Sequence, residues 1–152
     1  MRENFKMEIL MEIHQTSLLI VEDDSEILSI LENIFSKHFG IIYTADNGKI
    51  AQKIVNDKNP DIILTDIEMP ELSGLDFVIN IRSEGNNVPI VIMTGAKDRE
   101  YIIKAIKLGI HDFVDKPFKE SDVDSVIHRL LEISARENAL ILMPIIFGGR
   151  SI

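Results

Sequence analysis

Short apolar runs alternate along this chain with segments in which apolar residues recur every three or four positions. Short apolar runs rich in β-branched residues are typical of strands buried on both faces of a sheet. We expect strands at residues 17–21, 41–44, 62–65, 89–94 and 113–114. The periodic segments predict helices, because this repeat puts the apolar side chains on one helical face. We expect helices from 25 to about 38, 50 to about 58, 75 to about 83, 98 to 108, and 121 to about 136.

Turn and cap residues separate these segments. Gly40 and Gly109 follow predicted helices, Asn59-Pro60 ends another, and Asn47-Gly48 indicates a turn. Five strands that alternate with five helices favour a parallel sheet with helices on both faces. Because crossovers between parallel strands are right-handed, the expected fold is a doubly wound α/β domain of (βα)5 type.

The two ends of the chain fit this alternation less well. Residues 1–16 form an N-terminal extension that suits either a short amphipathic helix or a loose tail. We expect the domain itself at residues 17–136. The apolar tail at 137–152 carries no charge after Asn138 except Arg150. It would extend the last helix as far as Pro144, pack on the domain, form an oligomer contact, or begin a region that is missing here.

Composition narrows the functional classes. The chain has 152 residues, 45% of them hydrophobic and 27% charged, which is typical of a folded globular domain. A net charge of −9 argues against direct binding of nucleic acid, which requires clustered Lys and Arg. The absence of cysteine excludes disulfides and zinc–thiolate sites. No apolar run reaches the roughly 20 residues of a membrane span, and the first residues do not resemble a signal peptide, so we expect a cytoplasmic protein.

Polar side chains follow four of the predicted strands, at the point where each strand ends. An acid after a strand is most often a helix cap or a solvated turn, so each residue alone would have a structural explanation. In a parallel sheet, however, these positions meet at one edge, where ligands bind. Clustered carboxylates repel one another unless a cation neutralises them, and Mg²⁺ prefers carboxylate, carbonyl and water ligands. The residues concerned are Glu22, Asp23, Asp24, Asp66, Thr94 and Lys116.

This set of side chains suits phosphoryl transfer. Asp66 ends the central predicted strand and is the candidate nucleophile, because a carboxylate can accept a phosphoryl group. Asp23 is the candidate Mg²⁺ ligand, with Glu22 assisting directly or through water and the backbone carbonyl of Glu68 completing the protein ligands. The side chains that follow the last two strands, a hydroxyl and an ammonium, would contact phosphoryl oxygens.

Four motifs in this order and spacing resemble the receiver domain of two-component response regulators, a family that includes chemotaxis regulators. The resemblance covers residues 17–136. The motifs are Val21-Glu22-Asp23-Asp24, Thr65-Asp66-Ile67-Glu68-Met69-Pro70 with Gly74, Met93-Thr94-Gly95, and Phe113-Val114-Asp115-Lys116-Pro117-Phe118.

The resemblance implies a phosphorylation-dependent switch and not an enzyme with its own substrate. Asp66 would accept a phosphoryl group from a sensor histidine kinase or a phosphotransfer protein. Glu22 and Asp23 would bind Mg²⁺, and Lys116 would bind the phosphoryl group. Thr94 would then move inward and Phe113 would rotate, which changes the face made by the fourth helix, fifth strand and fifth helix.

The same resemblance implies the flavodoxin-like strand order 2-1-3-4-5 and a cis peptide bond between Lys116 and Pro117. It also implies a downstream protein, a missing output domain, or a homodimer through the switched face or the tail. Direct contact with nucleic acid or membrane is not expected.

Several residues depart from the common family pattern, and other functions stay open. Glu22 replaces a common Asp, Phe113 replaces a frequent Tyr, and Glu68 puts an acid two residues after the acceptor, where it would tune the lifetime of the phosphoryl group. Glu68 also suits an Asp-nucleophile phosphohydrolase, although Met69-Pro70 and the strand 1 acids fit a receiver better. A receiver that binds proteins without phosphorylation is a further alternative. A nucleotide or flavin binder is not favoured, because acids follow the first strand where a glycine-rich phosphate loop would be needed.

Overall fold

The computed structural model describes residues 2–4, 7, 15–69, 71–95, 99–117, 122 and 125–135. The strands are β1 (Ser17–Val21), β2 (Ile41–Ala45), β3 (Ile62–Asp66), β4 (Ile90–Thr94) and β5 (Asp112–Asp115). The helices are α2 (Ser25–Phe35), α3 (Gly48–Lys58), α4 (Gly74–Ser83) and α5 (Arg99–Lys107), and residues 125–135 form a further helix.

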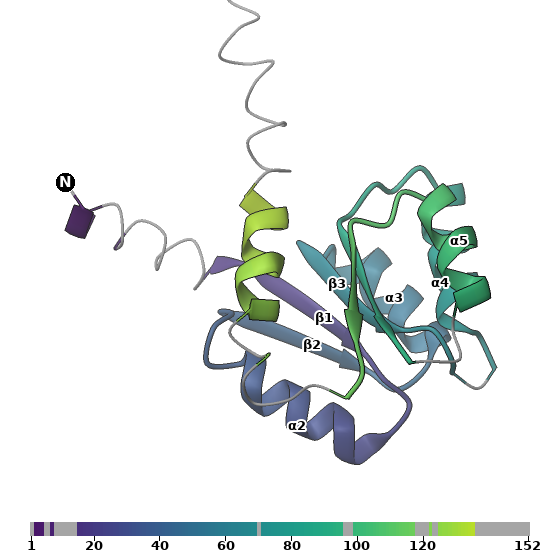
Figure 1. Cartoon of the computed structure of the whole chain (residues 1–152), viewed down its shortest axis with the longest axis horizontal. Helices are drawn as coiled ribbons and strands as arrows, with labels where there is room; N and C mark the ends of the chain where they lie inside the picture. The colour runs from purple at the N-terminus through teal and green to yellow at the C-terminus, as the bar shows by residue number, and fades with distance from the viewer. Residues whose placement is uncertain are drawn as a thin grey trace, which may run out of the picture.

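The strands of the described residues form one parallel sheet in the order β2-β1-β3-β4-β5 (Figure 1). Every pairing is parallel, with Leu19 opposite both Tyr43 and Ile63, and Ile63 also opposite Ile90. The predicted doubly wound fold and its strand order are therefore confirmed. β3 lies at the centre of the sheet, between β1 and β4, so the segment after β3 is flanked by strand ends on both sides.

Two apolar layers cover the sheet. Successive residues of a strand point to opposite faces, so Leu18 and Ile20 belong to one layer while Leu19 and Val21 belong to the other. The first layer is completed by α2 and helix 125–135. The second is completed by α3, α4 and α5. All five residues of β1, of β3 and of β4 are buried, which explains why these strands read as continuous apolar runs.

Most predicted boundaries agree with the structure to within one or two residues. The clearest difference concerns Asn47-Gly48, which the sequence predicted as a turn. Asn47 is instead the N-cap of α3, and its side-chain oxygen accepts a hydrogen bond from Ile50 N at 2.9 Å. Gly48 is already helical, so the helix begins two residues earlier than expected. The first helix ends at Phe35, and residues 36–38 form a turn.

Some expectations concern residues outside the described part of the chain. These are Pro70, Asp98 and Ser121, most of the extension at 1–16, and the tail at 137–152. The expected cis bond between Lys116 and Pro117 is present. No helix of the described residues is long and apolar enough to cross a membrane.

Candidate functional site

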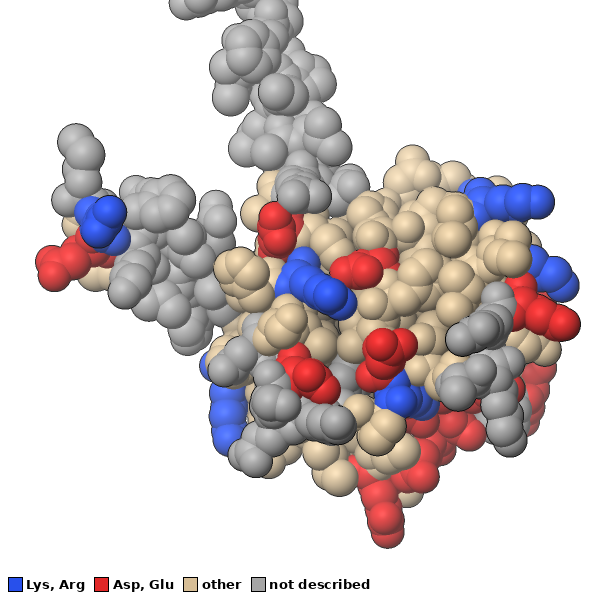
Figure 2. Space-filling model, viewed as in Figure 1, with Lys and Arg blue, Asp and Glu red and all other residues tan. Residues whose placement is uncertain are grey.

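A pocket of about 900 Å³ opens at the edge of the sheet where the parallel strands end. Its walls come from the segments that follow β1, β3, β4 and β5, together with parts of α2, α4 and α5. In the view of Figure 2, Asp and Glu side chains gather along the lower right of the molecule, whereas Lys and Arg are scattered. The pocket is thus at the sheet edge where the sequence predicted a ligand site.

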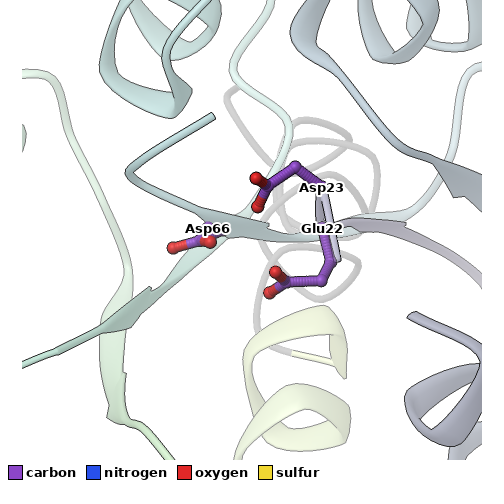
Figure 3. A group of neighbouring side chains, drawn as sticks. All are labelled: Glu22, Asp23 and Asp66. Atoms are coloured by element: carbon purple, nitrogen blue, oxygen red, sulfur yellow. The ribbon is translucent and has the colours of Figure 1, made fainter. Parts of the chain in front are cut away.

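Three carboxylates meet at the floor of this pocket. Each of Glu22, Asp23 and Asp66 offers an oxygen atom, and these atoms all lie within 4.8 Å of one another. Glu22 and Asp23 extend from the end of β1 toward Asp66 at the end of β3 (Figure 3). Glu22 and Asp66 are buried, while Asp23 is exposed. A cluster of two buried and one exposed carboxylates matches the oxygen ligands of a divalent cation such as Mg²⁺.

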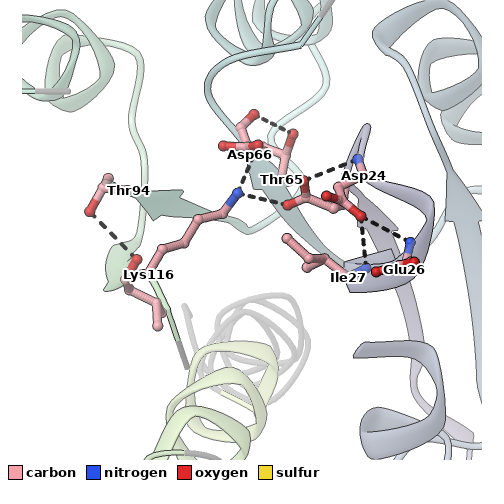
Figure 4. Close-up of polar contacts among 9 residues, drawn as sticks. Asp24, Glu26, Ile27, Thr65, Asp66, Thr94 and Lys116 are labelled. Carbon is pink, nitrogen blue, oxygen red and sulfur yellow. Dashed lines mark hydrogen bonds and ion pairs between the residues drawn. The ribbon is translucent and has the colours of Figure 1, made fainter. Parts of the chain in front are cut away.

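Lys116 joins two of these carboxylates. Its Nζ lies 2.8 Å from Glu22 Oε2 and 2.8 Å from Asp66 Oδ2. The side chain extends from the end of β5 toward Asp66 (Figure 4). The backbone N–H of Lys116 donates to Thr94 O at 2.8 Å, which fixes the start of this side chain against β4. The ammonium is therefore held between the carboxylates of Glu22 and Asp66.

Burial and ion pairing change the pKa values of Glu22 and Lys116. Burial raises the pKa of Glu22, and the nearby charge of Asp66 raises it further, against the hydrogen bond and charge of Lys116. For Lys116, burial alone would lower the pKa, but hydrogen bonds to Asp66 and Glu22 outweigh it and the pKa is raised. Lys116 therefore stays an ammonium, while the positive charge available to Glu22 is insufficient to offset its burial.

The turn after β3 depends on a close backbone approach. Gly74 N donates to Ile67 O at 2.7 Å, and a Cβ at Gly74 would lie 1.8 Å from Asp66 O. Only glycine allows this approach. Ser73 precedes it as the N-cap of α4, accepting a hydrogen bond from Asp76 N. The start of α4 thus packs directly against the backbone that carries Asp66.

The third acid after β1 has a structural role. Asp24 Oδ1 accepts hydrogen bonds from Glu26 N at 3.0 Å and Ile27 N at 3.2 Å, so Asp24 is the N-cap of α2. Its own N–H donates to Glu22 Oε1 at 3.3 Å. Of the three consecutive acids, two are therefore available to a cation, and the third positions the helix that follows.

Three predicted residues remain, and of these Thr94 and Phe113 are not among the residues that line the pocket. Glu68 lines the pocket with its side chain exposed. Thr94 is buried at the end of β4, and its hydroxyl donates to Val114 O at 3.5 Å and not to a site carboxylate (Figure 4). Phe113 is half-buried and packs against the apolar layer of α3, α4 and α5.

The sequence did not identify every residue of the pocket wall, and two of those missed lie on α5. Tyr101 and Lys104 of α5 both line it. They are three positions apart, which puts them on the same side of a helix. This spacing, in the helix that follows β4 and Thr94, is the sequence feature that could have indicated a shared role for Tyr101 and Lys104. It is weak, because the pattern does not say which side of α5 faces the strand ends.

Comparisons with known proteins agree with this geometry. The family model described as response regulator receiver domain matches residues 18–128. Regulatory protein AtoC of Escherichia coli (strain K12) is 28% identical over 123 residues, which are 81% of this chain and 27% of that protein. Transcriptional regulatory protein KdpE of Staphylococcus aureus (strain NCTC 8325 / PS 47) is 29% identical over 144 residues, which are 91% of this chain and 62% of that protein. The chain thus spans less than two thirds of the length of these relatives.

A solved structure gives the same result for the fold. The receiver domain of the Francisella response regulator 1452 superposes with a TM-score of 0.72 and 29% sequence identity. The match covers 81% of this chain and 99% of that one. The matched region therefore corresponds to a whole domain of that kind.

Proposed function

Because the chain belongs to the response regulator receiver domain family, we propose that it accepts a phosphoryl group on Asp66 from a phosphohistidine. The donor would be a sensor histidine kinase or a phosphotransfer protein. The observation that carries the proposal is the position of Asp66 at the end of the central strand. Its carboxylate lies 2.8 Å from the Lys116 ammonium and shares a cluster with Glu22 and Asp23.

The transfer would form one bond and break another. A carboxylate oxygen of Asp66 attacks the phosphorus, and the bond from phosphorus to the donor breaks with its electron pair leaving on the donor. With a small acyl phosphate the leaving group is a carboxylate, and with phosphohistidine it is an imidazole that takes up a proton from water. Lys116, which pairs with Asp66, would neutralise negative charge on the phosphoryl oxygens during this exchange.

The acidic cluster fits Mg²⁺. We propose that Glu22, Asp23 and Asp66 hold the ion through their carboxylates and Glu68 through its backbone carbonyl. The raised pKa of Glu22 supports this assignment, because it reflects a buried negative charge that one lysine does not fully balance. When bound, the ion would supply the additional positive charge that phosphoryl transfer requires.

We propose that Thr94 and Phe113 give the domain a two-state response. In the present arrangement the Thr94 hydroxyl donates to Val114 O, and Phe113, which precedes Val114 in β5, is half-buried and lies opposite Ile92 of β4. We propose that a phosphoryl group on Asp66 draws the Thr94 hydroxyl toward it and that Phe113 then moves inward. This would alter the face of α5, β5 and helix 125–135, where Ile103 and Ile106 are 63% and 59% exposed.

This face is the proposed output surface. It would bind a downstream protein, an output domain of a longer protein, or a second copy of the chain. We propose that residues 17–136 act as the receiver, with residues 1–16 and 137–152 outside it.

A direct test is phosphorylation by a small donor. Purified protein is incubated with Mg²⁺ and acetyl phosphate, and its intact mass is measured over time. We expect one added phosphoryl group, its loss in Asp66→Asn, and strong slowing when Mg²⁺ is chelated. Asp57→Asn, at an exposed position of α3, is the control and should be phosphorylated normally.

An equal adduct in Asp66→Asn would exclude Asp66 as the acceptor. Sustained release of phosphate from a simple phosphate ester would indicate a phosphohydrolase instead. A wild-type chain that acquires no phosphoryl group would indicate a receiver that binds its partners without phosphorylation.

A further inference from the structure

The charge of the pocket opposes the approach of any phosphodonor. The described residues that line it include six carboxylates and two ammonium groups, which together carry a formal charge of −4. A phosphoryl donor is itself an anion, and a bound Mg²⁺ would only halve the negative charge of the lining. The acids are Glu22, Asp23, Asp24, Asp66, Glu68 and Asp76, and the cations are Lys104 and Lys116.

One of the two lysines is already engaged. Lys116 donates to Glu22 and Asp66 at 2.8 Å each, so its ammonium is held on the floor of the pocket by two carboxylates. Lys104 is exposed, and it lines the same pocket from α5. It is therefore the lysine of the described lining that is placed to meet an anion before the anion reaches Asp66.

The position of α5 puts Lys104 on the side of Asp66 opposite the acids that follow β1. β1 and β4 flank β3 on opposite sides, so the acids after β1 and the helix after β4 lie on opposite sides of Asp66. Ala105 is fully buried and packs α5 against the sheet. With that side of the helix fixed, Tyr101 and Lys104 face the pocket, while Ile103 remains 63% exposed.

We propose that Lys104 is a donor-binding residue, whose ammonium contacts the phosphoryl oxygens of an incoming donor and guides them to Asp66, with Tyr101 forming the adjoining wall. The inference rests on the proposed phosphoryl transfer. It concerns the phosphoryl anion, which a small acyl phosphate and a protein phosphohistidine have in common. Lys104 acts on binding of the donor, and Lys116 acts at the reacting carboxylate.

The chain contains a matched control for this lysine. Lys107 is exposed on the same helix, also in its last turn, and does not line the pocket. Because α5 starts at the edge where β4 ends, Lys107 lies about 4.5 Å farther along the helix axis from that edge. Lys104→Ala and Lys107→Ala remove the same charge from the same helix and differ in their distance from the site.

The first measurement is the rate of phosphorylation against acetyl phosphate concentration at saturating Mg²⁺. We expect Lys104→Ala to raise the half-saturating donor concentration about three- to tenfold, the size of one exposed charge-assisted contact, with the maximal rate unchanged. Lys104→Arg should retain most of the affinity, and Lys107→Ala should match the wild type. The Lys104→Ala curve should also depend less on salt than the wild-type curve.

A second measurement does not require transfer. Acetylphosphonate, which cannot transfer its phosphonyl group, is titrated into Asp66→Asn and into Asp66→Asn/Lys104→Ala in the presence of Mg²⁺. The dissociation constant of acetylphosphonate should be about three- to tenfold higher for the double variant than for Asp66→Asn. If the wild type acquires no phosphoryl group, the proposed function fails while this titration still tests Lys104.

Three results would overturn the inference. They are equal affinities in the two titrations, an equal loss in Lys104→Ala and Lys107→Ala, and a loss that occurs with a phosphohistidine protein but not with acetyl phosphate. The last result would assign Lys104 to contact with the donor protein and not to the phosphoryl anion.

Discussion

At the scale of single residues, the absence of a side chain at Gly74 allows the start of α4 to pack on the backbone of Asp66. We predict that Gly74→Ala lowers the free energy of unfolding by about 1–3 kcal/mol or more, because its Cβ would lie 1.8 Å from Asp66 O. Urea unfolding measures this change. The control Asn80→Ala, at an exposed position of the same helix, should be neutral or slightly stabilising. Equal stability of Gly74→Ala and wild type would contradict the tight packing.

The buried Glu22 predicts a pH dependence of stability. Its raised pKa means that the folded protein binds the carboxyl proton more tightly than the unfolded chain does. As pH rises above the ordinary value of 4.5, the unfolded chain loses this proton first, so ionisation lowers the free energy of unfolding. We predict that Glu22→Gln, in metal-free buffer, becomes more stable relative to wild type as pH rises from this value to the raised pKa of the folded protein, above which the difference stays constant.

Urea unfolding over this pH range tests the prediction. The matched control is Glu32→Gln, at an exposed position of α2, which should run parallel to the wild type. A constant difference between Glu22→Gln and wild type would show that Lys116 fully offsets the burial of the Glu22 charge.

At the scale of elements, Arg82 joins the end of α4 to the segments around it. Its guanidinium donates to Leu108 O and Asn86 O at 2.8 Å each, to Val88 O at 3.0 Å and to Gly109 O at 3.2 Å. These acceptors lie before β4 and after α5, so one half-buried side chain fixes α5 relative to the sheet. The α5 wall of the pocket therefore depends on a residue at the opposite edge of the sheet.

We predict that Arg82→Lys lowers the free energy of unfolding by about 1.5–3 kcal/mol, because an ammonium cannot reach carbonyls in this planar fork arrangement. Arg129→Lys is the control. Arg129 forms an exposed pair with Asp112 at 3.7 Å, and the substitution should change stability little. Thermal and urea unfolding of both variants give the comparison. A similar loss in the two variants would mean that the carbonyl contacts contribute no more than a surface charge.

At the scale of the whole molecule, binding at the acidic cluster should stabilise the entire fold. β1 and β3 are interior strands of the sheet, so the acids at their ends lose their arrangement when the sheet unfolds. We predict that Mg²⁺ raises the free energy of unfolding by about 1.4 kcal/mol at ten times its dissociation constant. Asp23→Asn should reduce this gain, and Asp57→Asn on α3 should retain it. NaCl at equal ionic strength is the control, and an equal gain with NaCl would exclude a specific site.

The sequence predicted the architecture well because the sheet is buried on both faces. Continuous apolar runs such as 62–65 have few alternatives to a central strand, and their ends are marked by polar residues. The predicted turn at Asn47-Gly48 was wrong because an Asn-Gly pair suits both a turn and the N-terminus of a helix. Only the hydrogen bond from Ile50 N to its side chain distinguishes the two.

For the site, the sequence by itself determined which residues lie at the edge of the sheet where the strands end. The reason is that residues after parallel strands all lie at this same edge. It placed Glu22, Asp66 and Lys116 there without any knowledge of contacts. The tertiary structure decided how they are used: which acids are buried, which of them Lys116 bonds, and which side of α5 lines the pocket. These features depend on packing between segments distant in sequence, and no local pattern specifies it.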